Sequence, residues 1–207
     1  MAEVLIVLTG SNVWTMKDGS PHPTGFWARE FIEAHDAFTD GGLGVSIATP
    51  LGAKPTVDQL SWYPPYNNND EQFIAQQKKW LEAHAAELDA PLTLEDVEPD
   101  HYDVVYVVGG HGPMQDLAVH PTLGDLLVAN LDDPNKYVGA VCHGPASFLS
   151  ASSPVSRTTP RERRPVRLPR SSRCLDSPAA TCIRRRGHRS LTSTPRPSRA
   201  TVEHAVY

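Results

Sequence analysis

Cys142 and His143 stand side by side, and a thiol next to an imidazole is a pairing that nucleophilic catalysis uses. The run 137–141 before them is apolar and partly β-branched, which predicts a short buried strand. Pro145, just after them, suits the first turn of a helix. A bend between this strand and this helix would raise the cysteine out of the sheet, and the helix N-terminus would stabilise its thiolate. The spacing predicts a reactive thiol at Cys142.

The opposite interpretation of Cys142 is structural, because a free cysteine is among the most buried residue types and usually fills space. The neighbouring His143, the glycine at Gly144 and the expected helix start favour the reactive interpretation. Gly139, Ala140 and Gly144 are also small enough for the tight turn that a raised cysteine requires.

A second glycine-rich stretch, Gly109-Gly110-His111-Gly112, follows the valine-rich run 102–108. Backbone rich in glycine can approach a ligand closely and direct N–H groups at a developing oxyanion. A stretch of this kind is a weak signal alone, but here it stands one strand before Cys142. We expect both stretches to meet at the carboxyl ends of their strands, where α/β folds place their sites.

The elements that would position these residues alternate along the chain. Apolar runs predict strands over 4–8, 45–48, 102–108 and 137–141. Apolar residues at helical spacing predict helices from 25 onward, over 71–88 and over 121–130. This alternation indicates an α/β fold with a doubly wound, mostly parallel sheet flanked by helices.

The charge of the 207-residue chain is divided unevenly. Residues 1–150 hold six Lys or Arg and 21 acids, a net charge of −15, whereas residues 151–207 hold 13 arginines and three acids. An acidic body argues against nucleic acid as a partner. Three widely spaced cysteines predict neither a disulfide framework nor a zinc site and fit a reducing cytoplasm. We see no targeting segment and no run long enough to span a membrane.

The composition changes at residue 151, so we divide the chain into a domain at 1–150 and a tail at 151–207. The tail combines its arginines with seven prolines, nine serines and no lysine, and we expect no strand or helix in it except a helix-like end at 199–206. A basic arm for nucleic acid is disfavoured, because no aromatic residues are interleaved for base stacking.

This tail composition is what a G+C-rich coding region yields when it is read out of frame. We therefore predict a change of frame in the gene across the codons for residues 148–200. Sequencing the gene there would reveal it, and purified protein that carries this tail from a confirmed frame would contradict it.

Four separated motifs resemble the DJ-one/PfpI superfamily, the class I glutamine amidotransferase-like proteins, in the chaperone and glyoxalase III-like branch. The motifs occur in the family's order over residues 1 to about 150: Val4-Leu5-Ile6-Val7-Leu8-Thr9, Thr24-Gly25-Phe26-Trp27-Ala28-Arg29-Glu30, Gly109-Gly110-His111-Gly112-Pro113-Met114 and Ala140-Val141-Cys142-His143-Gly144-Pro145-Ala146. The resemblance implies a flavodoxin-like, PfpI-like sandwich.

The resemblance also implies three catalytic residues. Cys142 would be the nucleophile, His143 the general acid and base, and Glu30 the acid that hydrogen-bonds the thiol. A carboxyl beside a thiolate is expected to share one proton with it rather than ionise as well. In the family a downstream carboxylate, or sometimes another polar residue, holds the histidine. Here that region is the tail, where Asp176 matches no motif, so we leave the third triad member unassigned.

The oxyanion and substrate-binding groups that the resemblance implies are Gly110, His111 and Gly112. Neither a cofactor nor a metal is implied, and we interpret the scattered His22, His35, His84, His101 and His120 as surface or packing residues.

The implied activity is the conversion of methylglyoxal-type 2-oxoaldehydes to 2-hydroxy acids such as D-lactate, as in a glyoxalase III or D-lactate dehydratase. A protein or nucleotide deglycase-like stress protein is the related possibility, and the altered tail could leave the chain inactive. The resemblance further implies a small 2-oxoaldehyde substrate, a cytoplasmic location and a homodimer, with neither nucleic acid nor membrane as a partner.

Two other classes stay open. A glutamine amidotransferase-type or peptidase-like hydrolase shares the cysteine bend, but it normally needs a late His-x-Glu pair, and here Glu203-His204 has the reverse order. A non-enzymatic redox sensor or holdase chaperone would use oxidation of Cys142 or exposed apolar surface instead.

Overall fold

The protein, seen in a computed structural model, is described over residues 2–152 and 180–183. A six-stranded sheet with the order β5-β4-β1-β6-β7-β8 forms its centre, and a separate pair, β2-β3, forms a hairpin. The five strands from β5 to β7 are parallel, and β8 runs antiparallel to β7. The sheet strands are β1 Glu3–Val7, β4 Gly44–Thr49, β5 Leu92–Thr93, β6 Val104–Val107, β7 Tyr137–Val141 and β8 Ala180–Ile183.

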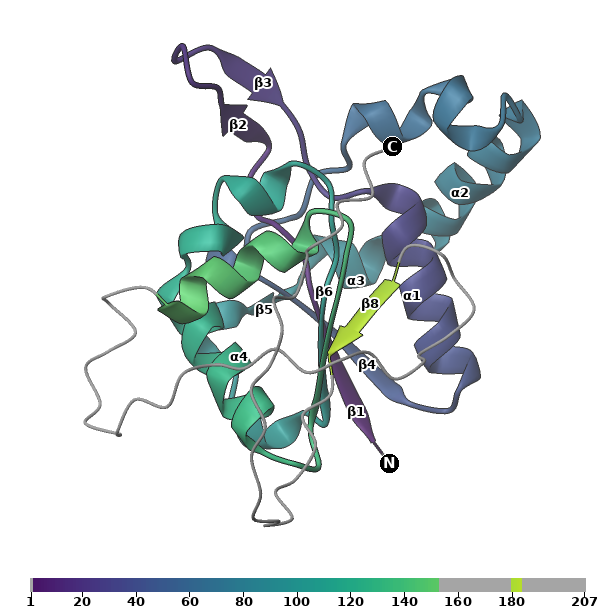
Figure 1. Ribbon diagram of the computed structural model, residues 1–207. Helices are drawn as coiled ribbons and strands as arrows, with labels where there is room; N and C mark the ends of the chain where they lie inside the picture. Colours follow the sequence, from purple (N-terminus) through teal and green to yellow (C-terminus); the bar gives the residue numbers. More distant parts are fainter. Residues whose placement is uncertain (1, 153–179, 184–207) are drawn as a thin grey trace, which may run out of the picture.

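Helices cover both faces of the sheet (Figure 1). On one side lie α1 (Ala28–Asp40), α2 (Glu71–Ala83) and α3 (Ala85–Asp89). On the other side lie α4 (Pro121–Asp132) and the 3₁₀ helix η8 (Gly144–Ser152), which follows the Cys142 bend. The structure thus has the doubly wound, mostly parallel architecture that the sequence predicts, a fold that buries its central strands on both faces.

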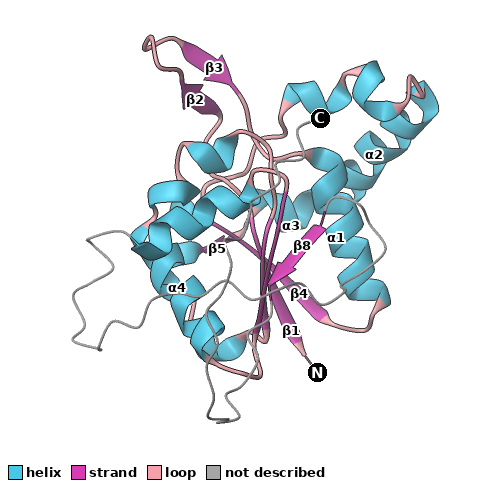
Figure 2. Ribbon diagram, viewed as in Figure 1, coloured by secondary structure: helices cyan, strands magenta, loops and turns pink. Residues whose placement is uncertain are grey.

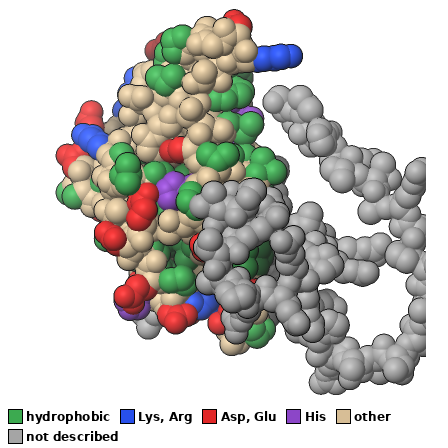
Figure 3. Space-filling model, turned by 90° about the vertical axis from the view of Figure 1, so that its left-hand side faces the viewer, with side chains coloured by type: hydrophobic (Ala, Val, Ile, Leu, Met, Phe, Trp, Pro, Cys, Tyr) green, Lys and Arg blue, Asp and Glu red, His purple; other side chains and the backbone are tan. Residues whose placement is uncertain are grey.

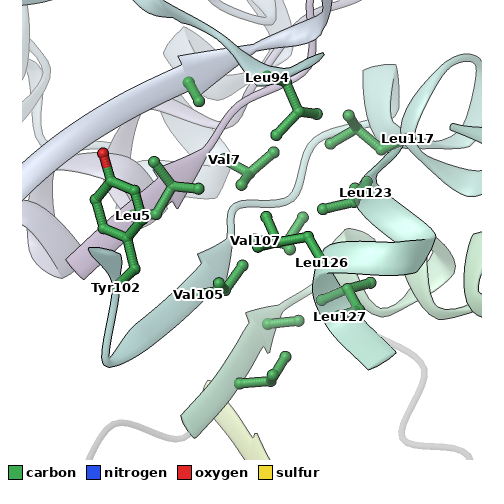
Figure 4. Close-up of a cluster of buried hydrophobic side chains, with 13 residues drawn as sticks. Leu5, Val7, Leu94, Tyr102, Val105, Val107, Leu117, Leu123, Leu126 and Leu127 are labelled. Atoms are coloured by element: carbon green, nitrogen blue, oxygen red, sulfur yellow. The ribbon is translucent and has the colours of Figure 1, made fainter. Parts of the chain in front are cut away.

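Strand β1 shows how the sequence produces this layering. Its residues from Val4 to Val7 are fully buried, because successive side chains point to opposite faces and each face meets a helical layer. Val4 and Ile6 pack with Phe31 of α1, whereas Leu5 and Val7 belong to the cluster with Leu127 of α4. Figure 4 shows this second cluster between the strands and α4. The continuous apolar run is therefore the signature of a two-sided burial.

Short 3₁₀ turns connect the main elements, and the hairpin β2-β3 projects from the body (Figure 2). The hairpin strands are β2 Val13–Thr15 and β3 Pro21–Pro23. The turns are η1 Pro50–Gly52, η2 Gln59–Trp62, η3 Pro64–Asn67, η4 Leu94–Asp96, η5 Pro99–His101, η6 Gly112–Met114 and η7 Leu117–Val119.

Three elements differ from the sequence prediction. The helix expected over 71–88 is divided at His84, whose backbone leaves the helical region while its ring stacks on Trp80. The element after Cys142 is a 3₁₀ helix. In the tail, where we expected no strand, Ala180–Ile183 pairs with the edge of β7, which offers a row of free backbone groups.

The rest of the tail, residues 153–179 and 184–207, lies outside the described residues, and with it Asp176 and the helix-like end at 199–206. The division into a domain at 1–150 and a tail therefore stays a prediction.

Acidic side chains are spread over the face shown in Figure 3, with few lysines or arginines among them, as the charge of residues 1–150 requires. Among the described residues, no helix is both long and apolar enough to cross a bilayer.

Candidate active site

Cys142 occupies a sharp bend directly after β7. Its backbone has a φ of 53°, in the left-handed region that side chains with a Cβ rarely adopt. This conformation costs about 1 kcal/mol for a residue other than glycine, and such strain is concentrated at functional sites. Cys142 is an exposed residue and carries a free thiol. The bend thus presents a thiol at the carboxyl end of the central strands.

Glu30 reaches this thiol from the first turn of α1, and Gly109 makes the approach possible. The Gly109 amide, just past β6, donates a hydrogen bond to Glu30 Oε2 at 3.1 Å. A Cβ at Gly109 would lie 2.6 Å from that oxygen and 2.7 Å from the Cβ of Cys142. Because no side chain fits there, only glycine allows the carboxyl and the thiol to form their hydrogen bond.

The electrostatics of this pair differ from the helix-stabilised thiolate that the sequence predicts. Burial raises the pKa of Glu30 to about 7. Burial of the sulfur, followed by the charge and hydrogen bond of Glu30, raises the pKa of Cys142 to about 11. Although the residue is exposed overall, its sulfur lies against a buried carboxyl and is partly desolvated. Burial and the neighbouring carboxyl outweigh the short 3₁₀ helix, so the thiol keeps its proton at neutral pH, whereas Glu30 titrates near pH 7.

Two backbone amides act in the other direction. The N–H groups of Gly110 and His143 hydrogen-bond the sulfur and favour its thiolate form. Gly110 has a φ of 97°, and a Cβ there would lie 2.3 Å from the carbonyl oxygen of Gly25, so this position also requires glycine. The amide of Gly112, in contrast, donates to the Gly25 carbonyl at 3.3 Å. Gly110 therefore faces the sulfur, whereas Gly112 fixes the loop.

His143 lies within reach of the thiol, with Nδ1 3.2 Å from the sulfur of Cys142. Burial, and then the charge of His111, lower the pKa of His143. The imidazole is therefore held neutral at neutral pH, the form in which it can accept a proton.

His111 completes the surroundings of the thiol. Its ring centroid lies 4.9 Å from that of His143, and on another side the ring stacks on Trp14 of the hairpin at 5.6 Å. Its Nδ1 lies 3.5 Å from the buried carboxylate of Asp58. The structure thus brings together five of the six residues that the sequence predicts for the site: Glu30, Gly110, His111, Cys142 and His143.

Asp58 and Trp14 were missed by the sequence analysis. Asp58 precedes a 3₁₀ turn and accepts a hydrogen bond from the Leu60 amide at 2.9 Å, so locally its sequence indicates only a helix cap. Trp14 stands in a three-residue strand of a hairpin, too short for a pattern. Neither residue carries a local signal for the site, because contacts across the fold place both of them.

Two histidines that we interpreted as scattered meet elsewhere in the fold. His35 of α1 is buried, and its Nε2 lies 3.1 Å from Oε2 of Glu87 in α3. One ligand atom each from His35, His84 and Glu87 lie within 4.8 Å of one another. These atom types bind divalent metals, but the contact between His35 and Glu87 also ties α1 to α3 directly.

The strained bend predicts an unusual order of stability for two variants that both lack the thiol. Cys142→Gly is expected to be more stable than Cys142→Ala by about 0.5–1 kcal/mol, because glycine adopts a positive φ without strain, although it loses more chain entropy on folding. Urea unfolding followed by tryptophan fluorescence measures the difference. An alanine variant at least as stable as the glycine variant would show that the bend is unstrained.

Comparisons with known proteins agree with this geometry. A model of the DJ-1/PfpI family matches residues 24–159. The Candida albicans protein named Glyoxalase 3 is 29% identical over 156 residues, which cover 74% of this chain and 63% of that protein. The Saccharomyces cerevisiae protein named Glutathione-independent glyoxalase HSP31 is 27% identical over 147 residues, which cover 70% of this chain and 59% of that protein.

Among solved structures, that of glyoxalase III from Candida albicans matches with a TM-score of 0.52 at 25% identity, covering 71% of this chain and 59% of that one. The chain spans less than two thirds of the length of these relatives. The match of the family model covers more than half of the chain and includes three of the four motifs, those from Thr24 onward. The chain belongs to the DJ-1/PfpI family, in its glyoxalase III-like branch.

Proposed function

We propose that the protein is a cysteine-dependent, cofactor-independent enzyme that converts methylglyoxal-type 2-oxoaldehydes to 2-hydroxy acids such as D-lactate. One observation carries this proposal: the Cys142 thiol touches an acid and a base at once, Glu30 through a hydrogen bond and His143 at 3.2 Å. The two glyoxalases that the chain is similar to support the choice of substrate.

The first step is addition of sulfur to the aldehyde. Glu30, whose pKa lies near neutrality, takes the thiol proton as the sulfur attacks the aldehyde carbon. A carbon–sulfur bond forms, the carbonyl π bond breaks, and the carbonyl oxygen takes up a proton to give a hemithioacetal. The amides of Gly110 and His143 favour the thiolate that this step requires.

The second step moves a proton between adjacent carbons. His143, neutral before the step, removes the proton from the carbon that carries sulfur, and the resulting enediol is reprotonated on the neighbouring carbon. The product is a thioester of the 2-hydroxy acid. Water then cleaves the thioester, releases the acid and returns the proton to sulfur. The sequence is redox-neutral overall, since one carbon is oxidised and its neighbour reduced, and it consumes one water.

The raised pKa of Cys142 weighs against a redox sensor, because sensor cysteines are commonly low-pKa thiolates. The hydrolase alternative depends on residues late in the chain, and Glu203-His204 lies outside the described residues. A cytoplasmic location, a homodimer and a stress-related or chaperone role stay expectations from the resemblance.

The activity test uses methylglyoxal without glutathione and measures D-lactate. The full chain is expected to form lactate, and Cys142→Ser to lose at least about 100-fold in rate, because a serine hydroxyl is a much weaker nucleophile. No lactate from the full chain, or an equal rate in the Ser variant, would contradict the proposal.

Glu30→Gln is expected to change thiol reactivity and activity in opposite directions. Loss of the carboxylate charge and of its hydrogen bond lowers the pKa of Cys142, so alkylation by iodoacetamide at pH 8 becomes faster. Lactate formation becomes slower, because the group that takes the thiol proton is lost. Asp40→Asn, at the exposed far end of the same helix, serves as the control. Slower alkylation in Glu30→Gln would refute the contact between the two groups.

A further inference from the structure

Asp58 is a buried acid whose partners converge on one point of the site. It is 1% exposed, its Oδ1 accepts from the Leu60 amide, and its Oδ2 accepts from the Thr24 hydroxyl at 2.9 Å. Among the described residues, the ionisable side chain beside Asp58 is His111, whose Nδ1 lies 3.5 Å from Oδ2 of Asp58. A buried carboxylate is stabilised by every donor that faces it, so the position of Asp58 favours a proton on that nitrogen.

Within the described part of the chain, Nδ1 of His111 has no partner other than Asp58 nearby. Nδ1 is buried and makes no hydrogen bond within the described residues. Buried donors normally have an acceptor, and the acceptor beside this nitrogen is Oδ2 of Asp58. Burial opposes the ionisation of Asp58, but the nearby His111 ring and the hydrogen bonds from Leu60 and Thr24 outweigh it and hold the pKa of Asp58 below its usual value. The acid therefore stays charged and orients the imidazole.

The ring of His111 contacts the ring of His143, so the orientation and charge of His111 affect His143. The His111 ring lies between Trp14, which stacks on it, and His143, whose centroid is 4.9 Å away. Two titratable groups face His143, namely His111 and Cys142, and Glu30 lies behind the sulfur. Three titratable groups face His111, namely Asp58, His143 and His22, whose ring centroid is 5.7 Å away. When His111 carries its second proton, its charge disfavours a second charge on His143.

We propose that Asp58 is a positioning residue: it fixes the tautomer and orientation of His111, and through His111 it keeps His143 in the neutral form that can accept a proton. Its meaning for catalysis rests on the proposed function, whereas the linkage of the three side chains is a property of the free protein. The two linked pairs, Asp58–His111 and Glu30–Cys142, then flank His143 from different elements of the fold.

The linkage is tested without substrate, so its failure is separate from failure of the glyoxalase proposal. Imidazole ¹H–¹⁵N correlation spectra of the full chain, recorded as a function of pH, give the tautomer of His111 and the titration midpoint of His143. We expect the neutral form of His111 to carry its proton on Nδ1. In Asp58→Asn the midpoint of His143 should rise by about 0.5 pH units or more, because the lost carboxylate no longer supports the positive charge on His111 that lowers the pKa of His143.

Two further variants make the outcome decisive. His111→Gln removes the positive charge of His111 itself and should raise the midpoint of His143 similarly, which keeps the test valid if Asp58→Asn does not fold. Asp116→Asn is the matched control, since Asp116 also caps a 3₁₀ turn and binds the Thr9 hydroxyl. An unchanged midpoint in both site variants, or an equal rise in Asp116→Asn, would overturn the proposal.

Discussion

The hydrogen bond between Glu30 and Cys142 is the interaction on which the rest of the site depends. It joins the first turn of α1 to the end of β7, and it passes over Gly109 at the end of β6, where a Cβ would collide with both partners. The start of α1 and the ends of β6 and β7, which are far apart in sequence, must therefore meet at one point. The parallel order of β1, β6 and β7, buried on both faces, supplies that alignment.

Charge at the site is divided so that each group can do one task. Glu30 and Cys142 share a proton because burial makes two charges on them costly. Asp58 stays ionised because two hydrogen-bond donors and the nearby His111 ring surround it. His143 lies between these two pairs and is held neutral. A nucleophile that is protonated at rest and ionised only as its proton moves to Glu30 is protected from nonspecific alkylation and oxidation.

Much of this arrangement could be predicted from the sequence, because it depends on local patterns. The apolar runs of β1, β6 and β7 and the glycines around His111 place the site at the strand ends. What could not be predicted depends on contacts across the fold. Asp58 has the sequence of a turn cap, and the break at His84 follows from stacking on Trp80. The prediction that the helix N-terminus holds Cys142 as a thiolate was wrong, because burial and Glu30, the acid that the resemblance implied, keep the proton on the sulfur.

The most direct test of the account is an ultraviolet titration of the thiolate of Cys142 in the variant Cys174→Ser/Cys182→Ser, which leaves one cysteine. If Glu30 and burial hold the proton on this thiol, its thiolate absorbance rises only well above the usual pKa of a cysteine, toward about 11. A thiol that is already fully ionised at pH 7 would contradict the shared proton and, with it, the assignment of Glu30 as the group that activates the nucleophile.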